Sequence, residues 1–324
     1  MKLERSTYQK PLSLTGLGGG ATSLGLGGAG VGSHFYFTYE TGGNYPQIQD
    51  IKVDSSANLY VSGKRDSSGA TLFKFDSKGA LQWGKKRDAS SIEFYGVEVD
   101  SSGNIYVAGY NNYQGSQMCV LKYNSSGVLQ WQRMLGNGTT SQDHRNYCLT
   151  MDTSDNVYLG GYEDSGGSDR MFLAKWNSSG SLQWQKTFQT GTYVDVIHSM
   201  EWASGNRLYV TGLTFQPSPY SSSNMYLGRF SSSNGSHSWS RIIRGSSGGA
   251  GMTFRNFDVA PYSNGGYVYS AGQIVNSQTG NESIILSSFN NGGTEQWSRV
   301  IWTSGGTTYV HGVDSDSSGN AYVL

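Results

Sequence analysis

The residues best suited to metal chemistry in this sequence are two histidines at matching places in a repeat. His198 and His311 each stand three residues before an acidic residue, Glu201 and Asp314 respectively. Two imidazoles that face one another could bind a metal ion. Histidines that pack or form hydrogen bonds within a sheet are the simpler interpretation, so we predict no metal site.

Short polar turns supply a second set of possible ligands. The turns read DSSAN, DSSGN, DTSDN and DSDSSGN, and their carboxylates are Asp54, Asp100, Asp152, Asp155, Asp314 and Asp316. Calcium takes about six to eight oxygen ligands, and these turns lack the distal bidentate Glu of an EF-hand. An Asp that opens a turn can also accept a hydrogen bond from the backbone two residues on. We therefore favour turns that cap themselves over calcium loops.

Other signatures of catalysis are scarce. The sequence has no H-E-x-x-H motif and no phosphate-cradling Gly-Lys-Ser/Thr motif. The Gly-rich segment 16–32 is superficially similar to a dinucleotide loop, but it follows no hydrophobic strand and no βαβ unit succeeds it. Cys119 and Cys148 are too few for a disulfide framework, and we expect a buried pair of thiols in adjacent repeats. We predict no enzymatic activity and no cofactor.

The elements that must position these residues form a repeat. A hairpin reads VDSSANLYVSG at 53–63, VDSSGNIYVAG at 99–109 and MDTSDNVYLGG at 151–161, and the chain stops within a further copy, DSDSSGNAYVL, at 314–324. A second recurring segment ends on an anchor residue, which is Trp83, Trp131, Trp184, Trp239 or Trp297. A period of about 50 residues with four short strands predicts the blade of a β-propeller. In the second repeat we expect the strands at 96–100, 105–110, 118–123 and 129–134.

The phase of the repeat predicts how the ring closes. The same number of residues separates Trp83 from Asp100, Trp184 from Glu201 and Trp297 from Asp314. We expect each of these acidic residues to close the first strand of the following repeat. The intervals from Trp131 to Asp152 and from Trp239 to Asp258 are slightly longer. Counted back from Asp54, the shorter interval reaches Phe37.

Phe37 therefore marks a candidate fourth strand, and ATSLGLGG at 21–28 a candidate third strand. Joined to the first two strands of the last copy, they give an all-β, six-bladed propeller closed by its N- and C-terminal strands, without open sheet edges. In the alternative, residues 1–33 are an extended Gly-rich arm that docks onto another subunit, and 34–324 form the propeller.

The hairpin pattern D-x-x-G-N-x-Y-V-x-G, followed by G-x-L-Q-W, resembles the SBBP-type bacterial β-propeller repeat. The likeness covers 35–324 and is clearest in the first three repeats, because EWASGNRLYVTG lacks the Asp and DVAPYSNGGYVYSAG has a longer turn. The D-x-x-G-x-x-x-W of Asp76 to Trp83 is also similar to the tryptophan-docking motif of quinoprotein dehydrogenases. That resemblance implies anchors that lock neighbouring blades. A quinoprotein would also need a cofactor pocket, usually eight blades and vicinal cysteines, which the sequence does not indicate.

Charge and hydropathy exclude several classes of protein. The net charge is zero, with 23 basic and 23 acidic residues, so there is no basic field for nucleic acid. No run of about 18 apolar residues predicts a membrane span. The segment 1–20 lacks the apolar centre of a secretory signal, so we expect synthesis in a cytoplasm.

The loops that differ most in length and sequence between repeats are expected on one face of the propeller. Propeller topology places 110–117, 135–147, 162–170, 190–196, 215–224 and 274–283 together, and a rigid scaffold with diverse loops is typical of recognition. The candidate contact residues are Tyr113, Arg145, Tyr162, Tyr193, Phe215 and Tyr220. Such residues suit stacking on sugar rings or contact with a protein, although each could simply pack its own loop.

We expect a non-catalytic virion component of a bacteriophage, located in the tail, a fibre or the capsid surface. Its partners would be other virion subunits through residues 1–33, and a host-surface glycan or a protein on the loop face. The alternative is a bacterial cell-surface or secreted propeller that binds polysaccharide or protein. A quinoprotein-like enzyme is a third class, and a bound chromophore would reveal it.

Overall fold

The computed structural model describes residues 46–324 with short gaps, together with the backbone of 12–13, 21–23 and 37–39. The gaps are 66–68, 88–91, 112–115, 137–142, 165, 191–193, 216–222, 245–251, 263–265, 277–278 and 303–308. Every regular element within the described ranges is a β-strand. This part of the chain therefore contains no helix able to span a bilayer.

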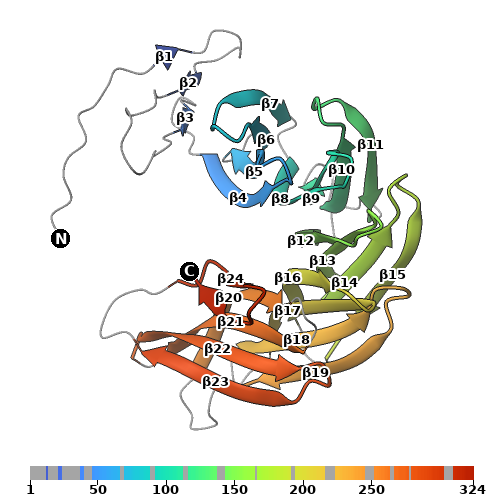
Figure 1. Ribbon diagram of the computed structural model, residues 1–324. Coiled ribbons are helices and arrows are strands. Elements are labelled where there is room, and N and C mark those ends of the chain that lie inside the picture. The colour runs from blue at the N-terminus through green and yellow to red at the C-terminus, as the bar shows by residue number, and fades with distance from the viewer. Residues whose placement is uncertain are drawn as a thin grey trace, which may run out of the picture.

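Successive strands pair antiparallel in groups of four, which we call blades (Figure 1). One parallel pair, Asp169 with Val194, joins the third and fourth groups into a single sheet. Blade 1 consists of β4 (Pro46–Val53), β5 (Leu59–Arg65), β6 (Ala70–Phe75) and β7 (Leu81–Arg87). Blade 2 consists of β8 (Ile92–Val99), β9 (Ile105–Asn111), β10 (Gln117–Tyr123) and β11 (Leu129–Leu135). Blade 3 consists of β12 (His144–Met151), β13 (Val157–Asp164), β14 (Asp169–Trp176) and β15 (Leu182–Phe188). The four strands expected in the second repeat are confirmed, and the first of them begins earlier than expected, at Ile92.

The C-terminal half continues the pattern. Blade 4 consists of β16 (Val194–Ala203), β17 (Arg207–Phe215), β18 (Ser223–Ser231) and β19 (His237–Ile243). Blade 5 consists of β20 (Met252–Pro261), β21 (Tyr267–Asn276), β22 (Glu282–Asn290) and β23 (Glu295–Trp302). A terminal hairpin follows, made of β24 (Val313–Ser315) and β25 (Ala321–Val323). At the other end of the chain, β1 (Leu12–Ser13), β2 (Ala21–Ser23) and β3 (Phe37–Tyr39) form a separate sheet.

The blades follow one another along an arc, with the first strand of each blade on the inside and the fourth on the outside (Figure 1). Apolar side chains fill the space between neighbouring blades. Leu72 of blade 1, for example, belongs to the same buried cluster as Phe94 and Val107 of blade 2. A blade that lies between two others thus buries both of its faces against its neighbours, which is how a propeller builds its core.

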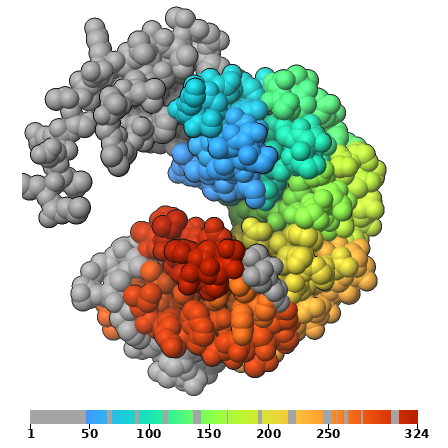
Figure 2. Space-filling model, viewed as in Figure 1, coloured from blue at the N-terminus to red at the C-terminus, as the bar shows by residue number. Residues whose placement is uncertain are grey.

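The two ends of the arc expose side chains that are buried everywhere else. Ile51 on β4 is 51% exposed, whereas Val97, at the same position of blade 2, is 1% exposed. Tyr322 on β25 is 56% exposed, whereas Tyr106 is 0% exposed. Figure 2 shows blade 1 in blue and the terminal hairpin in red as these two ends.

Both strands expected near the N-terminus are present, and they pair with each other. β2 begins at Ala21 and β3 begins at Phe37, and Ser23 is in register with Phe37. Among the described residues, however, β24 and β25 pair only with each other, and β1 occupies the second edge of β2. The described strands therefore show the two expected N-terminal strands as a hairpin, and among the described residues this hairpin does not pair with the C-terminal one.

The prediction that an acidic residue closes the first strand of each blade is wrong for Glu201 and Asp314. The backbone N–H of Asp100 bonds the carbonyl of Asn104, and Asp316 bonds Asn320 in the same way. The equivalent turn position in blade 4 is Ala203, the last register partner in its hairpin. Glu201 and Asp314 are instead the register partners of Tyr209 and Tyr322 on the neighbouring strand. They therefore precede the turn by two residues.

The polar turns cap themselves, as expected. In blade 3, Asp152 accepts hydrogen bonds from the backbone of Ser154 and Asn156, from the Asn156 amide and from the Tyr158 hydroxyl. Asp54, Asp100 and Asp316 open turns in the same way. These bonds hold the pKa of Asp152 below its usual value despite partial burial.

The anchor tryptophans lock each blade to the next, as the resemblance to docking motifs implied. The indole N–H of Trp83, Trp131, Trp184 and Trp239 donates to the carbonyl of Ser125, Ser178, Ser232 and Asn291 respectively. Each carbonyl lies in the turn between the third and fourth strands of the following blade. A positive-φ glycine of the same turn lies beneath the ring, and a Cβ on Gly180 would approach Trp131 to 2.9 Å.

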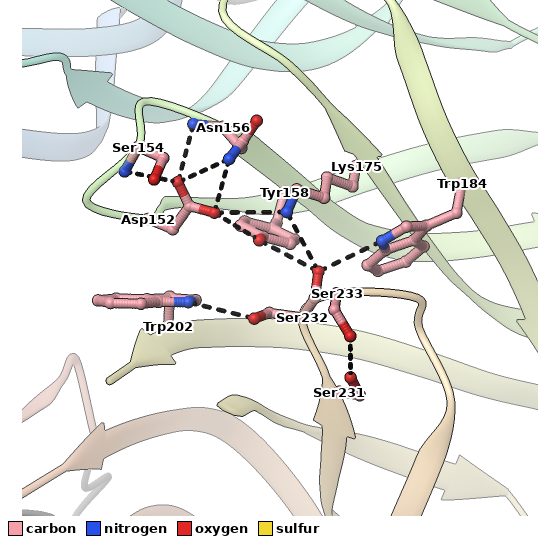
Figure 3. A network of polar contacts seen from close by, with 10 residues as sticks. All are labelled: Asp152, Ser154, Asn156, Tyr158, Lys175, Trp184, Trp202, Ser231, Ser232 and Ser233. Atoms are coloured by element: carbon pink, nitrogen blue, oxygen red, sulfur yellow. Dashed lines mark hydrogen bonds and ion pairs between the residues drawn. The ribbon is translucent and has the colours of Figure 1, made fainter. Parts of the chain in front are cut away.

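Figure 3 shows the lock between blades 3 and 4. The carbonyl of Ser232 accepts from the Tyr158 hydroxyl at 3.2 Å, the Lys175 ammonium at 3.3 Å and the Trp184 indole at 3.3 Å. The Lys175 ammonium also lies 3.4 Å from Asp152. A single backbone carbonyl of blade 4 thereby accepts hydrogen bonds from three side chains of blade 3.

Candidate functional site

A β-bulge recurs at the same place in the first strand of blades 1 to 5. The register shifts between Phe94 and Gly96 in β8, between Asn146 and Cys148 in β12, and between Ile197 and Ser199 in β16. The extra residues in these three strands are Tyr95, Tyr147 and His198. A bulge re-aims the side chain that it carries and is common beside binding sites.

The bulge aromatics contact one another from blade to blade. The Tyr95 and Tyr147 rings meet edge to face with centroids 5.3 Å apart. Tyr147 stacks on His198 at 5.4 Å with an interplanar angle of 13°. His198 in turn contacts Phe257 of blade 5 at 5.8 Å. A chain of rings thus crosses four blades along their first strands.

Arg145 and Tyr162, two of the predicted contact residues, lie together beside this chain. Arg145 holds Asp143 through two nitrogens, Nε at 2.9 Å and Nη2 at 2.7 Å. The Tyr162 hydroxyl donates to the same carboxylate at 2.8 Å. The Arg145 guanidinium lies 4.8 Å from the ring centroid of Tyr110, which stacks on Tyr95. We call Tyr95, Tyr110, Arg145, Tyr147 and Tyr162 the loop-face cluster.

Acidic and basic groups surround the loop-face cluster. The Tyr95 hydroxyl donates to Glu93 at 2.7 Å, and Lys64 of blade 1 lies 3.4 Å from the same carboxylate. Burial and the bond to Glu93 raise the pKa of Tyr95 far above its usual value. Burial opposes the ionisation of Asp143, but hydrogen bonds, with that from Arg145 the strongest, hold its pKa below the usual value. Both the ion pair and the phenol are therefore fixed in one protonation state near neutral pH.

Asp169 is the titratable group at the edge of the cluster that ionises nearest to neutrality. Burial, and then repulsion from Asp164 and Asp143, raises its pKa to about 6. His198 changes in the opposite sense, because burial lowers its pKa to about 4. His311 is exposed and lies beside Tyr309. The two histidines of the matching positions thus have different surroundings.

The remaining predicted contact residues divide into two groups. Phe215 ends β17, where it is in register with Val194 and Ser223 in blade 4. Within the described residues it makes no ring contact with the loop-face cluster. Tyr113, Tyr193 and Tyr220 lie outside the described residues.

The bulge aromatics were not among the predicted residues, although the sequence carries a signal for them. The final glycine of each hairpin motif lies on the second strand of its blade, next to the bulge in the first strand. A Cβ on Gly109 would lie 1.7 Å from the carbonyl oxygen of Glu93, and one on Gly161 would lie 1.9 Å from that of Arg145. A recurring glycine inside a strand marks close backbone approach, and it could have located Tyr95 and Tyr147.

A second group of titratable residues lies on the inner strands. Asp50, Glu98, Glu201 and Asp258 come from different blades, and Lys52 pairs with Glu98 at 2.8 Å. Burial raises the pKa of all four carboxyls, and that of Glu201 reaches about 8 because Glu98 adds repulsion. Asp258 accepts from Ser199 and from the backbone of Val313. In the described ranges, no three Asp, Glu, His or Cys side chains are grouped so as to hold a metal ion.

The two cysteines are free and buried in neighbouring blades, as predicted. Burial raises the pKa of Cys119 to about 12, and it raises that of Cys148 as well. Thiols in this state are poor nucleophiles.

Comparisons with solved structures identify the fold. The chain is similar to an ulvan lyase of polysaccharide lyase family PL25, bound to -[GlcA(1-4)Rha3S]-, with a TM-score of 0.51 and 12% identity over 77% of this chain and 69% of that one. It is also similar to the quinohemoprotein alcohol dehydrogenase of Comamonas testosteroni, with a TM-score of 0.52 and 9% identity over 84% of this chain. The match spans 55% of the dehydrogenase chain.

No protein-family model matches the sequence, and no curated protein matches it. At these identities a shared fold carries no shared activity. The antiparallel four-stranded blades, the inter-blade tryptophan locks and the structural neighbours together establish that the chain adopts a β-propeller fold.

Proposed function

We propose that this β-propeller is a non-catalytic recognition module whose loop face binds a glycan. The observation that carries the proposal is the convergence of four tyrosines and Arg145 from blades 2 and 3 at one place. Tyr110 and Tyr162 are buried beneath the cluster, whereas Tyr95, Tyr147 and Arg145 are partly exposed. The exposed parts of the Tyr95 and Tyr147 rings can contact sugar C–H groups, and tyrosine hydroxyls can form hydrogen bonds at the rim. A guanidinium held by Asp143 presents fixed donors to sugar hydroxyls or to a uronate.

The state of the titratable groups supports binding without catalysis. A general base works best when its pKa lies near the operating pH. The phenols of Tyr95 and Tyr162 have raised pKa values, and the Asp143 carboxylate is already bonded to Arg145 and Tyr162. Asp169, whose pKa is raised to about 6, lies at the edge of the cluster and is not one of its five residues. The five residues themselves are therefore better suited to holding a ligand than to transferring protons.

A polysaccharide array probed with the full chain tests the proposal. We expect retention on one class of bacterial surface polysaccharide, and loss of that retention in Arg145→Ala but not in Arg241→Ala. The Arg241 side chain also lies over an aromatic ring, that of Trp239 at 5.7 Å, but far along the chain from the cluster. Release of unsaturated or reducing sugar ends from a retained polysaccharide would overturn the non-catalytic assignment.

As its setting we propose a bacteriophage virion, with residues 1–33 contacting another subunit. The support is compositional: a neutral β-rich chain with few charges and a Gly-rich start. Quantitative mass spectrometry of purified particles tests this. A stoichiometric amount supports the proposal, and recovery in the envelope or medium fraction of a bacterial host instead favours a cell-surface or secreted propeller.

A further inference from the structure

A cavity of about 300 Å³ lies between blades 2 and 3. Blade 2 contributes Met118 from β10 and Leu135 from β11. Blade 3 contributes one residue from each of its strands: His144, Glu163, Phe172 and Gln185. A volume of this size is at the lower end of the range of small-ligand pockets, about 300–1,000 Å³.

The cavity is distinct from the loop-face cluster. His144 and Arg145 are consecutive residues of β12, so their side chains leave the strand on opposite faces. His144 lines the cavity, whereas Arg145 reaches Asp143 and the Tyr110 ring. A ligand in the cavity would therefore not compete directly for the Arg145 guanidinium.

One polar atom of a buried side chain in the cavity wall has no hydrogen-bond partner among the described residues. His144 is 4% exposed, and among the described residues its Nδ1 has no hydrogen-bond partner. An unsatisfied buried polar atom costs about 1–3 kcal/mol, so native proteins leave few of them. Glu163 is the register partner of His144 in β13, so the two side chains leave the sheet on the same face.

The lining defines the ligand chemistry. Met118, Leu135 and Phe172 form an apolar wall, and the imidazole, carboxylate and amide of His144, Glu163 and Gln185 provide both donors and acceptors. Glu163 is the one charged residue of the described lining, and the nearest cation in register with it is Arg170 on β14, outside the lining. An anion in the cavity would therefore meet the Glu163 carboxylate before any cation. A sugar ring carries apolar C–H faces together with hydroxyls that donate and accept.

We propose that this cavity binds one neutral sugar ring. The Glu163 carboxylate accepts from the sugar hydroxyls, His144 Nδ1 forms its missing hydrogen bond with one of them, and Phe172 contacts a C–H face. The site is independent of the glycan surface proposed above, because a free monosaccharide is sufficient to fill it.

Methyl glycosides of glucose, galactose and mannose test the inference on the full chain. The readout is the ¹³C-methyl signal of Met118, assigned with Met118→Leu. We expect a saturable shift with one glycoside at millimolar affinity, and about 10-fold weaker binding in Glu163→Gln, which keeps the shape and removes the charge. A thermal melt establishes that the variant is folded.

Matched controls separate this site from the rest of the molecule. Gln183 and Gln185 are both exposed on β15, but only Gln185 lines the cavity. Gln185→Ala should therefore weaken the shift, whereas Gln183→Ala should not. Arg145→Lys should leave the Met118 shift intact, so failure of the loop-face proposal and failure of this one give different results. The inference is overturned if no glycoside shifts Met118, if Glu163→Gln responds like the wild type, or if ethanolamine shifts the signal and the glycosides do not.

Discussion

The guanidinium of Arg145, on the first strand of blade 3, lies 4.8 Å from the ring centroid of Tyr110, on the second strand of blade 2. The same guanidinium is held by Asp143 at 2.7 Å. A cation over a ring in a partly buried setting contributes about 0.5–2 kcal/mol. The contact joins two blades at the loop face and fixes the arginine before any ligand arrives, which lowers the entropy cost of binding.

Arg145→Lys should weaken glycan binding about 10-fold, because an ammonium cannot form the two-point contact with Asp143 or stack over Tyr110. Isothermal titration with the polysaccharide retained on the array measures the change. Arg241→Lys is the control, since it alters a cation above Trp239 outside the cluster. Equal losses in both variants would contradict a role specific to Arg145.

Gly161→Ala should unfold the β-bulge that carries Tyr147. The added methyl would lie 1.9 Å from the Arg145 carbonyl oxygen, so the two strands must separate. We expect a loss of about 2–4 kcal/mol in the free energy of unfolding, measured by chemical denaturation. Gly266→Ala is the control, because a Cβ there meets nothing within 4 Å. A stable Gly161→Ala variant with unchanged glycan binding would show that the bulge does not position the ring.

Asp152→Ala should destabilise the protein by about 2–4 kcal/mol, because several buried donors lose a partner. It removes the nearer of the two acceptors of the buried Tyr158 hydroxyl, leaving the Ser232 carbonyl, and it removes the carboxylate beside Lys175 (Figure 3). Chemical denaturation measures the loss. Asp316→Ala provides the matched comparison, since the terminal turn has the same bonds to Asn320 and Tyr322 but is exposed. A loss as large for Asp316 as for Asp152 would mean that the turn alone, without the inter-blade lock, sets the stability.

Glu201→Gln should stabilise the protein at pH 8 and flatten its pH dependence. The folded pKa of Glu201, about 8, lies above its usual value of 4.5, so ionisation costs stability. That cost is absent below about pH 4.5 and grows as the pH rises to about 8. We expect a gain of roughly 1–2 kcal/mol at pH 8 and little change at pH 5. The variant leaves Thr150 as a donor to the side-chain oxygen and adds an amide beside Glu98.

Thermal melts of both proteins between pH 5 and pH 8 measure this dependence. The turn carboxylates do not obscure it, because the pKa values of Asp54, Asp100 and Asp152 are lowered and their contribution is lost only in acid. Parallel pH curves for the two proteins would rule out Glu201 as the titrating group.

The sequence was sufficient to predict the blades because local and long-range preferences agree in them. Asp152 and Asn156 specify a self-capped turn, and Trp184 supplies an inter-blade anchor, in positions that recur along the chain. The spacing of acidic residues was misleading, because Glu201 and Asp314 line the inner strands while Ala203 occupies the turn. A carboxylate in the sequence does not by itself say which face of a strand it occupies.

The candidate site was predicted only in part. Arg145 and Tyr162 were named for their place in a variable loop, and the structure brings them together on Asp143. Tyr95 and Tyr147 were missed because a bulge breaks the alternation by which strand faces are assigned. The contact between blades 2 and 3 depends on rings that are far apart in sequence, so no local pattern encodes it.

The alternative to a docking arm is closure of the ring, in which β2 and β3 would lie between blade 1 and the terminal hairpin. Four anchor tryptophans dock on a turn of the next blade, and within the described ranges no such turn follows Trp297. The β2–β3 hairpin is the remaining candidate, and exposed Ile51 and Tyr322 mark the two surfaces that it would cover.

Variants that lack residues 1–20 or 1–45 separate closure from docking. If β2 and β3 close the ring, only the second deletion should lower the melting temperature, speed amide exchange in β4 and β25, and promote self-association through the uncovered faces. The first deletion keeps both strands and serves as the control. If residues 1–33 are instead an arm for another subunit, both shortened chains should melt and exchange like the full-length protein, because neither removes part of the folded ring.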